Sequence, residues 1–162
     1  MWDGLSDVNG VQDVIEKDMI LLGQDLATKD DVLRLLVETA EKNGLITEQT
    51  PFLEAALQRE AQVPTAIGYR IAIPHGKSEV VKRPFVGMLQ ATSDFLWTEG
   101  HEEEVKLIFL IGVPQENEHN IHLKFISKLS KKLLDDEFRD ELVDCTDVER
   151  AYELLHSIGN PA

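Results

Sequence analysis

Apolar residues in this chain form two kinds of run, short continuous ones and longer periodic ones. The continuous runs have the length and composition of strands and lie at 19–22, 71–73, 85–91 and 105–113. The periodic runs repeat apolar residues every three or four positions, as helices do, and lie at 28–43, 50–59, from His119 or His122 to 134, 138–143 and 146–158. Strands that alternate with helices predict an α/β fold in which helices cover both faces of one sheet.

Residues at the ends of the periodic runs indicate where the helices begin. Thr28 can cap the first amides of one helix, and Pro51 suits the first turn of the next. Thr146 and Glu149 have the spacing of a capping box, which predicts that Thr146 caps the last helix. The run 105–113 is apolar almost throughout, so we expect a strand that is covered on both faces.

These elements predict one domain, because no internal repeat, low-complexity stretch or Pro/Ser-rich linker divides them. The first residues are rich in Asp, Gly and Asn. We therefore expect a loose lead-in over residues 1–10 and a single domain over residues 11–162. A chain of 162 residues is long enough to bury about two-thirds of its unfolded surface.

The acidic charge narrows the choice of partners. The chain carries 30 acidic and 16 basic residues, which gives a formal net charge of -14. Such a field repels nucleic acid and anionic membrane surfaces, so neither is an expected partner. A phosphoryl group could be held only by a few convergent basic groups acting against the global field.

Cysteine content and the longest apolar run indicate a cytoplasmic protein. Cys145 is the only cysteine, which excludes an internal disulfide and suits a reducing compartment. It has no neighbouring histidine or cysteine to activate it, so a structural thiol is favoured over a catalytic one. The N-terminus has no secretory pattern, and the apolar run 107–113 is far shorter than the ~20 residues that cross a bilayer.

The most informative stretch is Pro74-His75-Gly76, which follows a short apolar strand. Pro74 offers no N–H to a neighbouring strand, so it predicts the end of the ladder, and Gly76 lets the backbone turn. The stretch therefore presents the imidazole of His75 at a sheet edge. A neutral imidazole is a nucleophile at cytoplasmic pH and can carry a phosphoryl group. A turn histidine without a catalytic task has the same pattern.

The run Gly68-x-x-Ile71-Ala72-Ile73-Pro74-His75-Gly76 resembles the active-site signature of the fructose/mannitol-type A domains (EIIA type 2) of the bacterial phosphotransferase system (PTS). The resemblance extends over roughly residues 19–155. It implies a mixed sheet between helices and a phosphoryl group on His75. It also implies two protein partners: the phosphocarrier HPr, which donates the group, and an EIIB domain, whose cysteine accepts it.

The same resemblance indicates two residues that would stabilise the phosphoryl group. Arg59 lies sixteen residues before His75, where the family has an active-site arginine. A guanidinium can bind two phosphoryl oxygens and does not lose its charge, although a solvated cation at a helix end has the same pattern. The helix pattern after His122 matches the family's second histidine, and His119 is the lesser candidate. With these groups no cofactor and no metal is required.

Arg70 is a departure from the family, whose members usually have glycine two residues after Gly68. The arginine could crowd the turn or add a second cation near the phosphoryl group. It is also the only indication that the chain is an interaction domain that has lost its chemistry.

Two further alternatives remain at the level of sequence. A nitrogen-type EIIA protein has the same fold and uses phosphohistidine as a signal. A zinc hydrolase could use His75, His119 and His122, but no third-ligand or general-base pattern supports it. The sequence indicates neither the sugar nor the oligomeric state.

Overall fold

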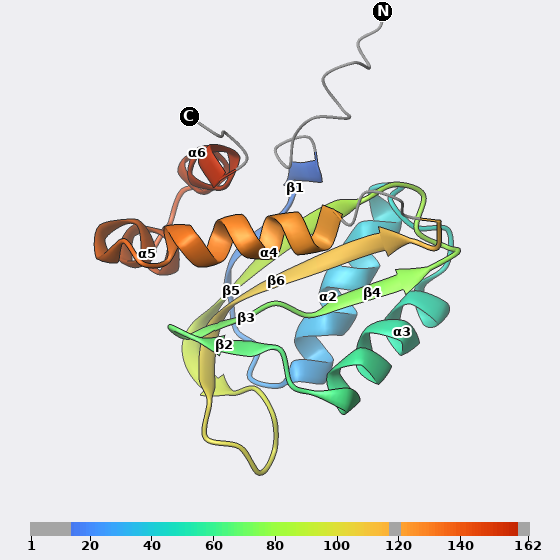
Figure 1. Ribbon diagram of the computed structural model, residues 1–162, viewed down its shortest axis with the longest axis horizontal. Helices are drawn as coiled ribbons and strands as arrows, with labels where there is room; N and C mark the ends of the chain where they lie inside the picture. Colours follow the sequence, from blue (N-terminus) through green and yellow to red (C-terminus); the bar gives the residue numbers. More distant parts are fainter. Residues whose placement is uncertain (1–13, 117–120, 159–162) are drawn as a thin grey trace, which may run out of the picture.

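The computed structural model describes residues 14–116 and 121–158 of the chain (Figure 1). Along these residues the order of elements is β1 (Ile15–Gln24), α2 (Lys29–Lys42), α3 (Gln49–Gln62), β2 (Ala66–Gly68), β3 (Ile71–Ala72), β4 (His75–Ser78), β5 (Phe85–Leu96), β6 (Glu104–Pro114), α4 (Ile121–Lys132), α5 (Asp136–Val143) and α6 (Val148–Ile158). The predicted lead-in at 1–10 lies outside the described residues, so the domain boundary stays a prediction.

The strands form one mixed sheet, which confirms the predicted fold class. Its order is β1-β5-β6-β3-β2, and β4 pairs with β6 beyond the end of β3. The pairs β1–β5, β3–β6 and β4–β6 are parallel, whereas β5–β6 and β2–β3 are antiparallel. β6 is therefore the strand that connects the two halves of the sheet.

Helices cover both faces of this sheet, as the sequence predicts (Figure 1). On one face, α2 and α3 bury Leu33, Leu36 and Phe52 against the sheet. On the other, α4, α5 and α6 bury Phe125 and Leu155 among other apolar residues. From Leu107 to Ile111, alternate residues of β6 point into the two cores, and Val105 and Val113 are buried as well, which explains why residues 105–113 are almost uniformly apolar.

Some local expectations are wrong. β2 and β4 lack the apolar run of a strand and are not predicted, because each is only three or four residues long and only partly buried. The cap of α6 is Asp147, not Thr146: the Asp147 carboxylate accepts the amide of Glu149 at 3.1 Å, and its carbonyl accepts the amide of Ala151. Either residue type can cap a helix, so the capping-box pattern was one residue out of register.

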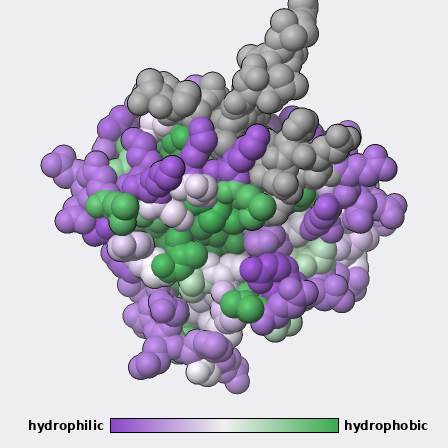
Figure 2. All heavy atoms as spheres, viewed as in Figure 1, coloured by the Kyte–Doolittle hydropathy of each residue, from purple (hydrophilic) through white to green (hydrophobic). Residues whose placement is uncertain are grey.

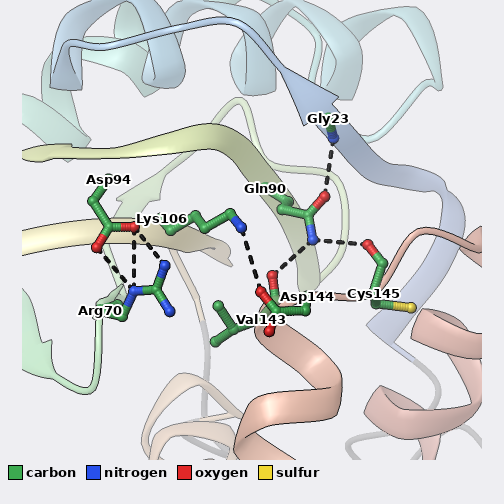
Figure 3. A network of polar contacts seen from close by, with 8 residues as sticks. All are labelled: Gly23, Arg70, Gln90, Asp94, Lys106, Val143, Asp144 and Cys145. Atoms are coloured by element: carbon green, nitrogen blue, oxygen red, sulfur yellow. Dashed lines mark hydrogen bonds and ion pairs between the residues drawn. The ribbon is translucent and has the colours of Figure 1, made fainter.

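A buried glutamine connects the C-terminal helices to the sheet (Figure 3). The side chain of Gln90 on β5 accepts the amide of Gly23 at 3.1 Å and donates to the carbonyls of Val143 and Cys145, both at 2.8 Å. Cys145 itself is buried, and its Sγ donates to the carbonyl of Asp147 at 3.2 Å. Both side chains have structural contacts. Over the described parts of the chain, no helix is long and apolar enough to cross a membrane.

Candidate functional site

His75 is the first residue of β4, a short strand on the outer side of β6. β3 pairs with β6 at Leu107 and Ile108, and β4 resumes the pairing at Ile111. Pro74 therefore interrupts the ladder without ending it, contrary to the prediction, because its carbonyl still accepts the amide of Ile111 at 3.0 Å. A proline lacks only the donor, so parallel pairing continues on the acceptor side. The imidazole is presented from a strand and not from a corner.

Gly76 has a different role from the predicted one. Its φ lies outside the positive range, so the backbone makes no left-handed turn there. A Cβ at this position would lie 3.0 Å from Cε1 of Phe52 and 3.1 Å from the backbone nitrogen of Ala56. Gly76 is therefore the place where α3 packs directly against β4. This close approach brings the last turn of α3 beside the start of β4.

Arg59 lies in that last turn of α3 and is half-buried. Its Nη1 donates to the carbonyl of Val63 at 2.9 Å. Its positive charge is close enough to His75 to lower the pKa of the imidazole. The structure thus brings together two of the three site residues that the sequence indicates.

The surroundings of His75 favour the neutral imidazole. Partial burial is the main reason why its pKa is lowered from 6.5, and the charge of Arg59 acts in the same direction. The contact between Nδ1 and the carbonyl of Ile73, at 3.4 Å, and the charge of Glu60 oppose the shift. A hydrogen bond to that carbonyl requires the proton on Nδ1, which places the lone pair on Nε2.

His122 is the second residue of α4, so its backbone lies in the first turn of a helix that begins shortly after β6. Its side chain and the whole of His119 lie outside the part of the chain that the structure describes. Their predicted roles stay predictions. Among the residues that are described, no three His, Cys, Asp or Glu side chains are grouped to hold a metal ion.

Arg70 lies at the far end of the sheet from His75. Its carbonyl accepts the amides of Lys106 and Leu107, whereas His75 pairs with Ile111. Lys106 and Ile111 are five residues apart on one strand, or about 16 Å. The guanidinium binds Asp94 through Nη2 at 2.6 Å and Nε at 2.9 Å (Figure 3). Arg70 therefore adds no second cation near His75.

Arg70 also shows why a glycine suits this position. Its φ is 67°, and that of Tyr69 is 58°. Both are left-handed conformations that favour glycine. The chain keeps the backbone shape of the turn, and the side chain of Arg70 finds a carboxylate partner outside it. The turn is not crowded.

The residue that sequence reasoning missed is Glu60, whose charge also acts on His75. It is 4% exposed, and with Phe52 and Ala56 it forms the buried side of α3. This spacing of four was visible in the sequence: a glutamate continues the apolar face of the helix. A buried carboxylate in that register indicates a specific set of donors.

Apolar side chains are exposed on the elements that follow α3 and at the start of α4. Figure 2 shows hydrophobic residues gathered in the middle of the face that carries α4. The exposed large apolar residues include Val63 in the connection from α3 to β2, Ile67 in β2 and Leu123 in the first turn of α4. Exposed apolar surface of this kind is typical of a protein-binding site.

Comparison with known proteins gives a consistent family. Residues 13–158 match the family model described as "Phosphoenolpyruvate-dependent sugar phosphotransferase system, EIIA 2". The PTS fructose-specific EIIABC component of Mycoplasma pneumoniae is 34% identical over 86% of this chain, which spans only 20% of that protein. The fructose-specific EIIA component of Haloferax volcanii is 26% identical over 94% of this chain and 98% of its own length. The fructose-like EIIA component of Escherichia coli K12 is 37% identical over 68% of this chain and 74% of its own length.

Solved structures agree with this family. IIA mannitol of Escherichia coli matches with a TM-score of 0.73 at 30% identity, over 86% of this chain and 97% of its own. The complex of enzyme IIAMtl with phosphorylated enzyme IIBMtl from the same organism matches with a TM-score of 0.75 at 26% identity, over 88% and 99%. The nitrogen regulatory protein IIA-Ntr of Neisseria meningitidis has a TM-score of 0.79 over 90% and 98%, but its 23% identity shows the fold alone.

Proposed function

Because the chain belongs to the EIIA 2 family of the phosphoenolpyruvate-dependent sugar phosphotransferase system, we propose that His75 accepts the phosphoryl group and that Arg59 and His122 stabilise it. Components of this family are phosphotransferases that work through a phosphohistidine intermediate. The observation that supports His75 is its setting: a half-buried imidazole at the start of β4, with a lowered pKa and a guanidinium beside it.

The first step is an in-line attack by Nε2 of His75 on the phosphorus of phospho-HPr. A new N–P bond forms as the N–P bond of the donor breaks, and the donor imidazole leaves. The proton on Nδ1 stays with His75, facing the carbonyl of Ile73. The transition state is loose and spreads negative charge over the equatorial oxygens. Arg59 uses one N–H on Val63, so its other donors are available for those oxygens.

The second step transfers the group to a cysteine of a cognate EIIB domain. The thiolate attacks phosphorus, an S–P bond forms, and the lone pair returns to Nε2. The structure of a relative in complex with a phosphorylated IIB protein supports such a partner. The exposed apolar side chains of Val63, whose carbonyl holds Arg59, and of Leu123, in the first turn of α4, suit two protein partners that dock in turn. The reaction takes place in the cytoplasm and requires neither a cofactor nor a metal.

Radiolabel from phosphoenolpyruvate tests the acceptor. The chain is incubated with enzyme I, HPr and labelled phosphoenolpyruvate, and we expect an acid-labile phosphoryl group on the wild type. His75→Ala should abolish the label, whereas His101→Ala, at an exposed position, should keep it. Label that persists in His75→Ala would overturn the assignment.

Transfer from the labelled chain to EIIB distinguishes a transport component from a nitrogen-type regulator. Label should move to a purified cognate EIIB domain and not to its cysteine-to-serine variant. Failure with each EIIB domain encoded nearby would favour the regulator. Stoichiometric zinc in protein purified without added metal would support the hydrolase instead.

A further inference from the structure

The connection from α3 to β2, residues 63–65, lies between a buried carboxylate and the strand that leads to His75. Arg59 and Glu60 are neighbours on α3 but lie on different sides of the helix. Arg59 is half-buried, whereas the side chain of Glu60 is only 2% exposed. A carboxylate that is removed from water needs donors for both oxygens, so its contacts show what it does.

Glu60 receives donors from three separate parts of the chain. Its Oε1 accepts the indole Nε1 of Trp97 at 2.9 Å and the amide of Thr65 at 3.3 Å, and it pairs with Nζ of Lys29 at 3.1 Å. Its Oε2 accepts the hydroxyl of Thr65. Lys29 begins α2, Trp97 follows β5, and Thr65 precedes β2. The carboxylate therefore connects residues 63–65 to the start of α2 and to the end of β5, both of which are far from these residues in the sequence.

From Thr65 a series of backbone contacts leads to the imidazole. The carbonyl of Thr65 accepts the amide of Ile73 at 3.0 Å. The carbonyl of Ile73 faces Nδ1 of His75 at 3.4 Å. Glu60 and the ring of His75 are thus linked through two peptide units. At the other end of the same connection, the carbonyl of Val63 holds Nη1 of Arg59 at 2.9 Å.

We propose that Glu60 is a positioning residue for phosphoryl transfer: by holding Thr65, it fixes the carbonyl that orients His75 and the segment that holds Arg59. The proposal rests on the proposed role of His75. Small displacements of a reacting group have large effects on rate, because transfer needs the attacking atom in line with the bond that breaks. Glu60 itself does not touch the phosphoryl group.

Lys29 makes the buried carboxylate compatible with an anionic substrate. An uncompensated negative charge at Glu60 would oppose the arrival of a phosphoryl group. Lys29 is 17% exposed, pairs with Glu60, donates to Oγ1 of Thr98 at 3.0 Å and lies 5.2 Å from the centroid of the Trp97 ring. The described charged groups whose fields reach His75 are Arg59 and Glu60.

The test compares Glu60→Gln with Glu54→Gln. Glu54 is an exposed residue of the same helix, so its variant loses the same charge without the buried contacts. We expect Glu60→Gln to lower the kcat for phosphoryl acceptance from phospho-HPr by about tenfold or more, with little change in KM. The control variant should match the wild type. A merely structural role would lower the folded fraction and leave kcat per folded molecule unchanged.

Nitrogen-15 NMR of His75 gives a readout that does not depend on turnover. In Glu60→Gln the signal for the proton on Nδ1 should weaken in favour of the other tautomer, and the pKa of His75 should fall further because a negative charge is lost. In Glu60→Asp, which keeps the charge, the pKa should stay close to that of the wild type, and kcat should be partly restored relative to Glu60→Gln.

A folded Glu60→Gln protein with the kcat and the tautomer of the wild type would overturn the proposal. Should that variant not fold, Trp97→Phe removes one donor from Glu60 and keeps an aromatic ring beside Lys29. It should show a smaller loss of kcat and a change of tautomer in the same direction, and unchanged values would again overturn it. If the wild type takes up no phosphoryl group, the proposed function fails, whereas the NMR comparison still tests the positioning.

Discussion

The arginines at the two ends of the β3–β4 side of the sheet have different binding partners. At the β2–β3 end, Arg70 binds Asp94 at 2.6 Å, and nearby Lys106 binds Asp144 at 3.4 Å (Figure 3). At the His75 end, Arg59 binds the carbonyl of Val63, and among the carboxylates of residues 14–116 and 121–158 it has no ion-pair partner. Among the described residues, each of the other five arginines has a carboxylate partner: Arg34, Arg70, Arg83, Arg139 and Arg150. The difference separates an arginine that holds the fold together from one whose charge is available to a phosphoryl group.

The largest expected difference between the two ends is in the rate of phosphoryl acceptance when each arginine is removed in turn. We expect Arg59→Ala to lower the rate of phosphoryl acceptance by about a hundred- to a thousandfold, since a donor to the transition-state oxygens is lost. Its stability should change by less than about 1 kcal/mol, because the side chain is half-buried and, among the described residues, its hydrogen bond is to the carbonyl of Val63. Quenched-flow labelling measures the rate of phosphoryl acceptance, and urea unfolding measures the free energy of unfolding.

Arg70→Ala is the matched control for that variant. It removes the same charge from the opposite end of the sheet and should keep the acceptance rate of the wild type. Equal losses in the two variants would mean that net charge, and not the position of Arg59, determines the rate.

Glycines at the two ends should respond in different ways. In Gly76→Ala the new Cβ meets Phe52 and the backbone of Ala56, so α3 must shift. We expect a loss of about 1–3 kcal/mol in the free energy of unfolding, together with slower acceptance, because α3 carries Arg59. Gly68→Ala has open space around its Cβ but a φ of +89°. It should lose about 1 kcal/mol by backbone strain and keep the acceptance rate. An unchanged rate in folded Gly76→Ala would contradict the role given to this contact.

The elements with a clear period were predictable from the sequence, and the short ones beside the site were not. The run 107–113 predicted a strand covered on both faces, the spacing of Leu33, Leu36 and Val37 predicted a helix, and both predictions are confirmed. The four residues His75–Ser78 contain no apolar alternation, because β4 is defined by backbone pairing with β6 and by the contact with α3.

The site shows the same division. The motif around His75 was visible locally, and Arg59 was found by resemblance. The role of Glu60 depends on Lys29 and Trp97, which are far away in the sequence and meet it only in the folded chain. Likewise, Gly76 was interpreted as a turn residue because no local pattern shows that Phe52 packs against it. Long-range contacts are what the sequence alone could not supply.

We expect the rate of phosphoryl acceptance to change by only a few-fold with pH. The pKa of His75 is lowered from 6.5, so the neutral nucleophile should persist below pH 6.5, and the rate should fall only at more acidic pH. Because the folded state binds its proton less readily than the unfolded one, His75 should also reduce stability as the pH falls through 6.5. Titration of the ring by NMR gives the pKa. In Arg59→Ala the pKa should rise, since that cation lowers it; an unchanged pKa would place Arg59 out of reach of the imidazole.

The smallest effect is expected where the chain departs from its family, in Arg70→Gly. Glycine relieves a left-handed conformation that costs roughly 1–2 kcal/mol for other residues, but it gives up the bond to Asp94 and adds freedom to the unfolded chain. The ion pair is partly exposed and contributes about 0.2–1 kcal/mol. These terms largely cancel, so the free energy of unfolding should change by less than about 1 kcal/mol. Arg70→Ala keeps the strained backbone and loses the same bond, so it should be about 1 kcal/mol less stable than Arg70→Gly in urea unfolding. Both variants should accept the phosphoryl group at the rate of the wild type. A loss of acceptance in the glycine variant would show that the arginine reaches the chemistry after all, because the backbone it leaves behind is the one the family prefers.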